Sequence, residues 1–118
     1  MAKRILIVED TQSIAGLFNR IIEKSGFTVE TAGDHGEAGE KISSFNPDLI
    51  ILDIMLGEVT GIQYALKLRE GGLDTPILFV TALDDAEVHA AARRVGQGLL
   101  KKPFSQEDLL AKINQLLE

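Results

Sequence analysis

Residues 49–53, Leu-Ile-Ile-Leu-Asp, restrict the possible folds of this chain more than any other stretch, because four apolar residues in a row end abruptly in a carboxylate. A run this short, placed after Asn46 and Pro47, favours a β-strand that is buried on both faces. Its isoleucines support a strand over a buried piece of helix. The carboxylate of Asp53 needs an explanation, since burial of an unpaired charge costs free energy.

Short apolar runs alternate with amphipathic stretches along the whole chain. From Ile14 to Ile22 apolar residues recur at intervals of three or four, which is typical of a helix with one buried face. Four further helices are predicted to start at the capping patterns of residues 34–37, 60–63, 84–87 and 105–108. Strands are predicted at residues 4–8, 27–31, 49–53, 76–80 and 98–101. This alternation predicts one parallel sheet with helices on both faces, joined by right-handed crossovers.

The composition is that of an ordinary globular domain, and it excludes several classes of function. With 118 residues, 45% hydrophobic and 25% charged, the chain is expected to form a single domain over residues 1–118. No apolar run is long enough to span a membrane, and no cysteine is available for a disulfide, a thiolate metal site or a nucleophile. The net charge of −6 argues against direct nucleic-acid binding by this domain. We therefore expect a cytoplasmic protein without a signal peptide.

Reactive side chains stand at the carboxyl ends of the predicted strands. In a parallel sheet these ends lie along one edge, where ligands bind. In strand order, the polar residues found there are Glu9, Asp10, Asp53, Thr81 and Lys102. Neighbouring carboxylates repel one another unless a cation neutralises them, and oxygen ligands without His or Cys favour magnesium. A magnesium ion, an aspartate nucleophile, a lysine and a hydroxyl together suit phosphoryl transfer.

Each of these residues also has an ordinary structural explanation when it is taken alone. An aspartate at the end of a strand is commonly solvated, Asp10 could help to start a helix, Thr81 could cap one, and Lys102 could be a surface lysine. Their coincidence at four strand ends favours the functional interpretation. The two histidines, His35 and His89, stand alone on predicted helices and are expected to be solvated rather than to bind a ligand.

Four motifs carry a resemblance to a known family. They are Ile-Val-Glu-Asp at 7–10, Pro-Asp-Leu-Ile-Ile-Leu-Asp-Ile-Met-Leu at 47–56 with Gly61, Val-Thr-Ala-Leu at 80–83 and Lys-Pro-Phe at 102–104. From residue 3 to residue 117 the chain resembles the receiver domain of bacterial two-component response regulators, of the chemotaxis-regulator type. The resemblance implies a flavodoxin-like, doubly wound (βα)5 fold of three layers, with a five-stranded parallel sheet of order 2-1-3-4-5. In that order the first and third strands are neighbours, so Glu9, Asp10 and Asp53 would crowd together.

The resemblance also implies a role for each residue that matches the motifs. Asp53 would be the phosphoacceptor, charged by a histidine kinase. Asp10, Asp53 and the backbone carbonyl of Met55 would hold Mg²⁺, with Mn²⁺ as an alternative ion. Glu9 would support the metal from the second shell, through water.

The phosphoryl group would have its own set of ligands. The resemblance implies that Thr81 follows this group, that Lys102 pairs with it, and that the peptide bond between Lys102 and Pro103 is cis.

The resemblance implies a signalling role and the partners that belong to it. Phosphorylation would switch the surface of the fourth helix, fifth strand and fifth helix, where a downstream protein target or an output domain would bind. The phosphoryl donor would be a histidine kinase or a histidine phosphotransfer protein. A phosphorylation-dependent dimer is among the forms the protein could take. The domain would promote only its own phosphorylation and dephosphorylation and would not be an enzyme acting on outside substrates.

The sequence departs from the family pattern in three ways. Leu99 stands where the family usually has Tyr or Phe, so the familiar coupling between Thr81 and an aromatic ring is not available. Gly57 stands where the family often has Pro. Met55 and Leu83 are apolar at positions flanking the route of an attacking water, and we therefore expect the phosphorylated form to decay slowly.

Two other functions are compatible with parts of the sequence. Leu99 is compatible with a receiver-like adaptor that binds partners whatever its phosphorylation state. The presence of Asp10, Asp53, Thr81 and Lys102, however, argues that the phosphoryl-transfer chemistry has been kept. A magnesium-dependent phosphatase of the haloacid dehalogenase type would carry Asp-x-Asp-x-Thr after a strand, and Met55 stands where the second Asp of that motif would be.

Overall fold

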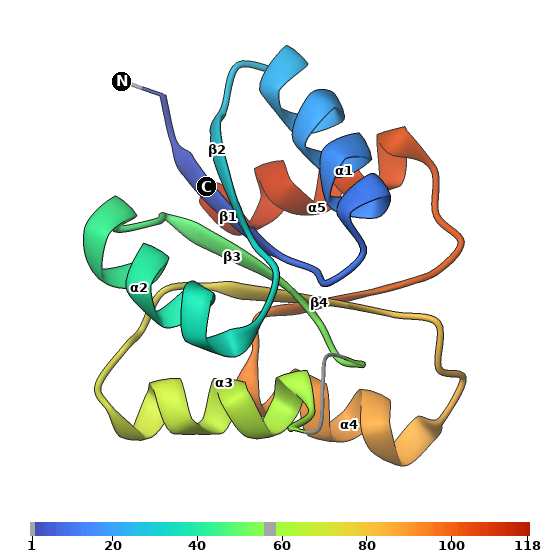
Figure 1. Cartoon of the computed structure of the whole chain (residues 1–118). Coiled ribbons are helices and arrows are strands. Elements are labelled where there is room, and N and C mark those ends of the chain that lie inside the picture. Colours follow the sequence, from blue (N-terminus) through green and yellow to red (C-terminus); the bar gives the residue numbers. More distant parts are fainter. Residues whose placement is uncertain (1, 56–58) are drawn as a thin grey trace.

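The computed structural model describes residues 2–55 and 59–118, and within these ranges the chain forms five strands and five helices in alternation (Figure 1). The strands are β1 (Arg4–Val8), β2 (Thr28–Ala32), β3 (Leu49–Asp53), β4 (Ile77–Thr81) and β5 (Gly98–Lys101). The helices are α1 (Gln12–Lys24), α2 (His35–Phe45), α3 (Gly61–Glu70), α4 (Ala86–Val95) and α5 (Gln106–Leu117). Gly57, one of the departures from the family pattern, lies outside the described residues.

All strand pairs in the sheet are parallel, and the strand order is β2-β1-β3-β4-β5. The chain thus starts in the sheet at β1, moves outward to β2, and then crosses back over β1 to β3. The carboxyl ends of β1 and β3 are therefore the switch point at which ligands bind in folds of this kind. The predicted fold class is confirmed.

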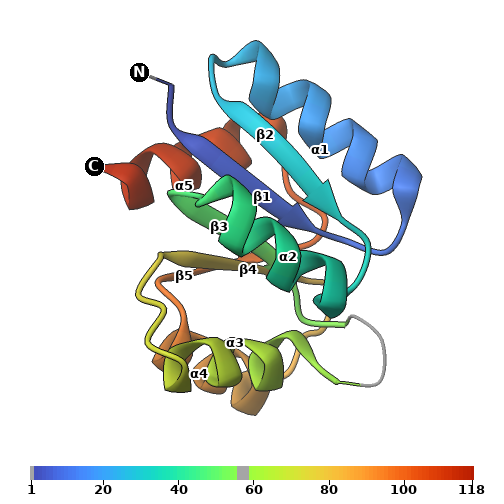
Figure 2. The same cartoon turned by 60° about the vertical axis from the view of Figure 1, so that its left-hand side comes forward.

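Helices cover both faces of the sheet, which gives a molecule of three layers (Figures 1 and 2). Helices α1 and α5 lie on one face, and α2, α3 and α4 lie on the other. Along β3, Ile50 and Leu52 belong to the core under α2, α3 and α4, whereas Leu49 and Ile51 belong to the core under α1 and α5. Burial on both faces explains why this strand is apolar without interruption.

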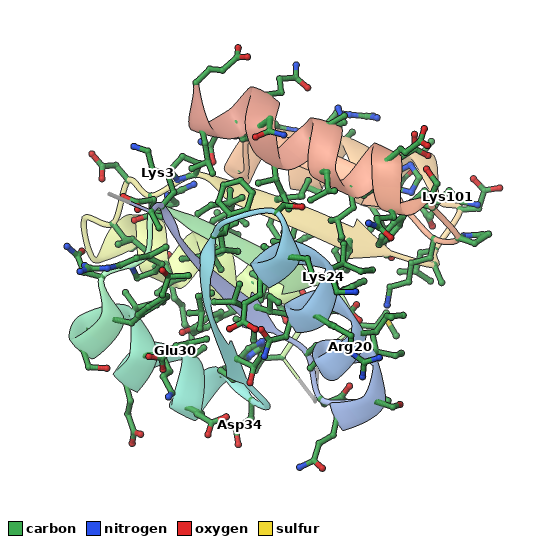
Figure 3. All side chains as sticks on the ribbon, turned by 90° about the horizontal axis from the view of Figure 1, so that it is seen from above. Lys3, Arg20, Lys24, Glu30, Asp34 and Lys101 are labelled. Atoms are coloured by element: carbon green, nitrogen blue, oxygen red, sulfur yellow. The ribbon has the colours of Figure 1, made fainter. Side chains whose placement is uncertain are left out.

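Most charged side chains lie on the outside of these layers. The view in Figure 3 shows Arg20 and Lys24 projecting from α1 and Asp34 at the start of α2, and all three are exposed. None of the helices in residues 2–55 and 59–118 is long and apolar enough to cross a membrane.

Three strands have the predicted bounds, and two begin one residue later than predicted. Strand β4 begins at Ile77 because Pro76 has no N–H group to donate to the ladder, although its carbonyl accepts a bond from the Ile50 N–H. Strand β2 begins at Thr28, which donates to the Lys3 carbonyl, and it ends at Ala32 rather than at Thr31.

The predicted capping patterns start the helices, with two differences. At α4 the cap is Asp85, the second residue of the pattern at 84–87, and it accepts the N–H groups of Glu87 and Val88. Helices α3 and α5 begin with complete capping boxes, formed by Thr60 with Gln63 and by Ser105 with Asp108. At α2, Asp34 accepts a bond from the Glu37 N–H as predicted. The Glu37 carboxylate, however, accepts from the N–H of Gly33, at 2.6 Å, so the return bond goes to the residue before the cap.

Candidate functional site at the carboxyl edge of the sheet

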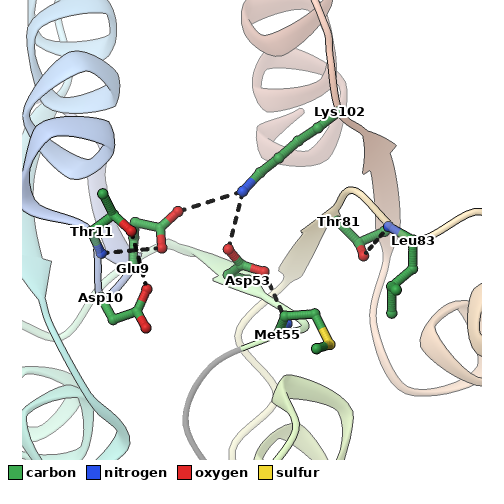
Figure 4. A network of polar contacts seen from close by, with 8 residues as sticks. All are labelled: Glu9, Asp10, Thr11, Asp53, Met55, Thr81, Leu83 and Lys102. Atoms are coloured by element: carbon green, nitrogen blue, oxygen red, sulfur yellow. Dashed lines mark hydrogen bonds and ion pairs between the residues drawn. The ribbon is translucent and has the colours of Figure 1, made fainter.

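The polar residues that follow the strands gather at the switch point, as Figure 4 shows. Asp53 ends β3, the strand between β1 and β4. It therefore lies between the acidic pair Glu9 and Asp10 on one side and Thr81 on the other. The backbone continues the sheet one step further, because the Ile54 N–H donates to the Val80 carbonyl at 3.1 Å. Asp53 is thus held by the backbone of an inner strand of the sheet.

Both carboxylate oxygens of Asp53 have hydrogen-bond donors. Asp53 is only 6% exposed. Its Oδ1 accepts the Met55 N–H at 2.9 Å, and its Oδ2 accepts a bond from Lys102 Nζ at 3.1 Å. These two bonds orient the carboxylate and offset the cost of its burial.

Lys102 joins three strand ends. Its ammonium group is 3.1 Å from Asp53 Oδ2 and 3.5 Å from Glu9 Oε1. Its backbone N–H donates to the Thr81 carbonyl at 2.7 Å, and the peptide bond to Pro103 is cis, the geometry that the resemblance implies. Burial by itself lowers the pKa of Lys102, but the hydrogen bond and charge of Asp53, together with the charge of Glu9, outweigh burial and raise it. Lys102 therefore stays cationic at neutral pH.

The carboxylate of Glu9 is buried, and its hydrogen bonds offset only part of the cost of that burial. It is 4% exposed, and its Oε2 accepts the Thr11 N–H at a long 3.4 Å. Its Oε1 accepts no hydrogen bond from any residue in the described parts of the chain. Burial is the main cause that raises the pKa of Glu9, and the neighbouring charge of Asp53 adds to it. A further positive charge near Glu9 would therefore lower the energy of the site.

The residues of this site fit a magnesium ion. Carboxylate and carbonyl oxygens are its preferred ligands, and Mg²⁺ retains several waters, so one or two protein carboxylates suffice. Oε1 of Glu9, which accepts no hydrogen bond from the described residues, and the exposed carboxylate of Asp10, next to Asp53, supply such a donor set. Within the ranges 2–55 and 59–118, no three His, Cys, Asp or Glu side chains gather into a ready-made metal cluster. The three acidic residues are thus neighbours, but they do not form the tight carboxylate group that the strand order suggested.

Thr81 is fully buried, and its hydroxyl is engaged away from Asp53. Thr81 Oγ1 accepts the N–H of Leu83 at 3.0 Å. Among the described residues, no hydrogen bond joins Thr81 to Asp53 or to Lys102 Nζ. Because a hydroxyl both donates and accepts, the O–H proton of Thr81 is available to another acceptor.

The first residue of α3 packs closely against the backbone of Asp53 and Ile54. Gly61 donates its N–H to the Ile54 carbonyl at 2.7 Å. A Cβ atom at this position would overlap the carbonyl oxygen of Asp53 and lie 3.0 Å from Ile54 Cα. Only glycine allows α3 to begin this close to the site.

Both histidines are tied to neighbouring elements, so the prediction that they are solvated is wrong. His35 stacks on Tyr64 with ring centroids 4.1 Å apart, and its Nε2 is buried. His89 Nε2 lies 2.7 Å from the carbonyl oxygen of Leu83, and the residue is half-buried. Both contacts depend on how the helices pack against their neighbours, and no local pattern in the sequence predicts that packing.

Leu99 lies on β5 beside the site. It is in register with Phe79, two residues before the pair formed by Thr81 and Lys101. It is half-buried and packs against the core under α2, α3 and α4. An aliphatic side chain has no hydrogen-bonding group, so Leu99 contributes only packing.

The fold and the site together define a doubly wound α/β domain whose polar chemistry is concentrated around one buried aspartate. A family model for the response regulator receiver domain matches residues 5–114. The chain therefore belongs to this family, the receiver domains of two-component signalling systems. This membership leaves the phosphatase alternative without support.

Curated relatives and solved structures agree with this assignment. The chain is 39% identical over 118 residues to the response regulator MprA of Mycobacterium ulcerans, covering 99% of this chain and 51% of that protein. It is 38% identical to the alkaline phosphatase synthesis transcriptional regulatory protein PhoP of Bacillus subtilis, covering 99% of this chain and 49% of that protein. The chain thus spans about half the length of these relatives.

Receiver domains of known structure superpose closely. The Vibrio cholerae chemotaxis protein CheY4 gives a TM-score of 0.91 at 31% identity, covering 99% of this chain and all of that one. The response regulator receiver domain of Bermanella marisrubri gives 0.91 at 32% identity over the full length of both chains.

Proposed function

We propose that this chain is a phosphoacceptor switch, in which Asp53 takes a phosphoryl group from a histidine kinase or a histidine phosphotransfer protein. The observation that carries the proposal is the orientation of the Asp53 carboxylate, which is buried at the switch point and held by Lys102 Nζ at 3.1 Å and the Met55 N–H at 2.9 Å. Aspartate carboxylates are competent nucleophiles for forming an aspartyl-phosphate.

In the proposed reaction, one carboxylate oxygen of Asp53 attacks the phosphorus of the donor phosphohistidine. A P–O bond forms, the P–N bond breaks, and its electron pair stays on the imidazole nitrogen. Lys102 is already within 3.1 Å of Asp53, so it would pair with the new phosphoryl oxygens without moving far. The hydroxyl of Thr81 would donate its proton to another of these oxygens.

Magnesium fits the acidic side of the same site. Asp10, Asp53 and the backbone carbonyl of Met55 would hold the ion, and Glu9 would support it through water. When bound, the ion neutralises the carboxylates and the phosphoryl oxygens that meet there, and Mn²⁺ would serve in the same way. The buried Oε1 of Glu9, which accepts no hydrogen bond from the described residues, supports this assignment.

The signal would leave the domain on the side of α4, β5 and α5. When Thr81 turns toward a phosphoryl group on Asp53, the loop that it holds through Leu83 would move as well. Such a movement would shift the equilibrium between two forms of this surface. The partner would be a downstream protein, an output domain or, in a phosphorylation-dependent dimer, a second copy of the chain.

The test is phosphoryl uptake from acetyl phosphate with Mg²⁺, followed by intact mass and by phosphate-affinity electrophoresis. We expect the native protein to gain one phosphoryl group and Asp53→Asn to gain none. Asp74→Asn is the matched control, because Asp74 is exposed and precedes β4 at the opposite edge of the sheet. If neither acetyl phosphate nor a panel of histidine kinases phosphorylates the native protein, the proposal is wrong.

One observation favours a second function, a receiver-like adaptor that binds partners whatever its phosphorylation state. Leu99 cannot hydrogen-bond and therefore cannot report on Thr81 as a tyrosine would. In that case the affinity for a partner would be the same for the native protein, phosphorylated or not, and for Asp53→Asn. A change in the affinity for a partner on phosphorylation would support the phosphoacceptor switch over the adaptor.

A further inference from the structure

A chain of two hydrogen bonds leads from the buried site to the fourth helix. Thr81 Oγ1 accepts the N–H of Leu83 at 3.0 Å, and the carbonyl oxygen of Leu83 lies 2.7 Å from Nε2 of His89 on α4. Leu83 thus uses both of its backbone polar groups, one toward the site and one toward the helix. The three residues belong to β4, to the loop after it and to α4.

The direction of the second bond follows from its chemistry. A backbone carbonyl only accepts hydrogen bonds, so the hydrogen must be on Nε2 of His89. At 2.7 Å this is a short bond for a nitrogen donor, and it lies in a half-buried place where water competes poorly. His89 is therefore bound firmly to the loop.

This bond is not needed to start α4. The first turn of the helix is already satisfied, because Asp85 Oδ1 accepts the N–H groups of Glu87 and Val88, at 2.9 and 3.1 Å. The backbone N–H of His89 donates to the Asp85 carbonyl in the ordinary helical way. The side chain of His89 adds a link between helix and loop beyond what the helix end requires.

The backbone of Thr81 is held on its other side. Its carbonyl accepts the Lys102 N–H at 2.7 Å, and its strand partner on β5 is Lys101. A change at Thr81 therefore acts mainly through its side chain and through the loop that begins at Ala82. Leu99, two residues before Lys101 on β5, has no polar group with which to sense that change.

We propose that His89 is a positioning residue that couples α4 to the state of Thr81 through the Leu83 carbonyl, in place of an aromatic side chain at position 99. The proposal rests on the proposed function, because it describes how a phosphoryl group on Asp53 is reported. When the Thr81 hydroxyl turns to the phosphoryl group, its bond to the Leu83 N–H shifts. Because His89 holds the carbonyl of the same residue, the first turns of α4 move with the loop.

Two substitutions of similar shape separate the donor from the bulk of the side chain. His89→Gln keeps an N–H donor of similar reach, whereas His89→Met has a similar length without one. Both residues are good helix formers, so helix propensity does not distinguish them. Arg93→Met, at an exposed position of α4, is a control for substitution on this helix.

The first measurement uses the unphosphorylated protein and does not depend on the chemistry of Asp53. Amide hydrogen exchange is compared for residues 81–84 by NMR. We expect faster exchange of the Leu83 amide in His89→Met than in the native protein, and native rates in His89→Gln and Arg93→Met. Equal rates in the Met and Gln variants would show that the donor does not hold the loop, and would overturn the proposal.

The second measurement follows amide chemical shifts with acetyl phosphate and Mg²⁺, at equal extents of phosphorylation verified by mass. In the native protein and in His89→Gln, phosphorylation should shift residues 81–84 and residues 86–95 together. In His89→Met we expect the shifts of residues 81–84 to remain and those of residues 86–95 to be lost.

The outcomes distinguish the coupling from the function on which it rests. Shifts of α4 in His89→Met that equal the native ones overturn the coupling alone, and so does a failure of His89→Gln to restore them. If the native protein takes up no phosphoryl group, the proposed function is wrong, and the proposed coupling of α4 to phosphorylation is wrong with it.

Discussion

At the scale of single residues, the site is a balance of buried charges. Glu9 and Asp53 are both buried, and Lys102 is the cation that the structure places within 3.5 Å of each. Lys102 donates to Oδ2 of Asp53, so both oxygens of that carboxylate have a donor. Oε1 of Glu9, in contrast, accepts no hydrogen bond from the described residues. Asp53 is therefore oriented without a metal, whereas the acidic pair beside it still favours a second cation.

The apolar side chain of Met55 should protect the phosphorylated form. Met55, two residues after Asp53, is 59% exposed and offers no group that could position an attacking water. We expect the phosphorylated native protein to decay several-fold more slowly than Met55→Asn, in which an amide can hold that water. The measurement is the half-life of the phosphorylated form with Mg²⁺, and equal or faster decay of the native protein contradicts the prediction.

His35 should make the stability of the protein depend on pH. Burial is the main cause that lowers the pKa of His35 below 6.5, and Lys67 on α3 adds to it, whereas Asp34 opposes it. The unfolded chain therefore takes up the proton first as the pH falls. The folded state is favoured most above about pH 6.5, and this contribution is lost as the pH falls toward the lower folded-state pKa.

The variant that removes this titration is His35→Phe, which keeps a ring against Tyr64. We expect its free energy of unfolding in urea to fall less than that of the native protein between about pH 8 and about pH 5.5. At the higher pH it should be at least as stable as the native protein, because the buried Nε2, for which the described residues offer no hydrogen-bond partner, is gone. Parallel curves for the two proteins would show that His35 does not contribute.

At the scale of secondary-structure elements, the start of α3 is as important for the site as the strands are. The N–H of Gly61 bonds to the Ile54 carbonyl, and its Cα approaches the backbone of Asp53 more closely than a side chain would allow. The capping box of Thr60 and Gln63 determines where this helix begins. The position of Asp53 thus depends on a helix that follows it in the sequence.

Gly61→Ala should therefore damage both stability and chemistry. Its Cβ would overlap the carbonyl oxygen of Asp53, and overpacking of this kind costs about 1–3 kcal/mol. We also expect slower phosphoryl uptake from acetyl phosphate, because the Asp53 backbone must shift. Gly71→Ala, at the other end of α3, is the control: its Cβ would meet only ordinary contacts at 3.5 and 3.6 Å. A Gly61→Ala protein as stable and active as this control would refute the prediction.

At the scale of the whole molecule, the two cores stabilise the fold and the carboxyl edge of the sheet carries the site. Helices on both faces bury the strands and hold the sheet rigid, so the carboxyl edge can carry charged groups that contribute little to the core. The net charge of −6 and the acidic side of the site both favour cations.

Magnesium should accordingly stabilise the whole fold. A ligand that binds only the folded state adds about 2.7 kcal/mol at 100 times its Kd. We expect the thermal midpoint to rise with Mg²⁺ concentration and to return to its starting value when the ion is chelated. Asp10→Asn should lose most of this rise, and because Asp10 is exposed the variant should fold normally. An equal rise in Asp10→Asn and the native protein would place the ion elsewhere.

Much of the fold follows from local patterns in the sequence. The alternation of apolar runs and amphipathic stretches predicts the parallel sheet, because each pattern reports the burial of its own segment. The strand order came from the family resemblance and not from the residues. The bounds of β2 and β4 shifted by one residue because ladder bonds, rather than apolar character, determine where a strand begins.

The sequence by itself determined which polar residues lie at or next to the carboxyl ends of the strands, since parallel strands end at a common edge whatever the details of packing. Only the tertiary structure decided how these residues pair. Lys102 reaches Asp53 across 49 residues of chain, and His89 on α4 reaches back to the carbonyl of Leu83 in the preceding loop. Such contacts depend on the packing of whole helices against the sheet, which no local pattern encodes.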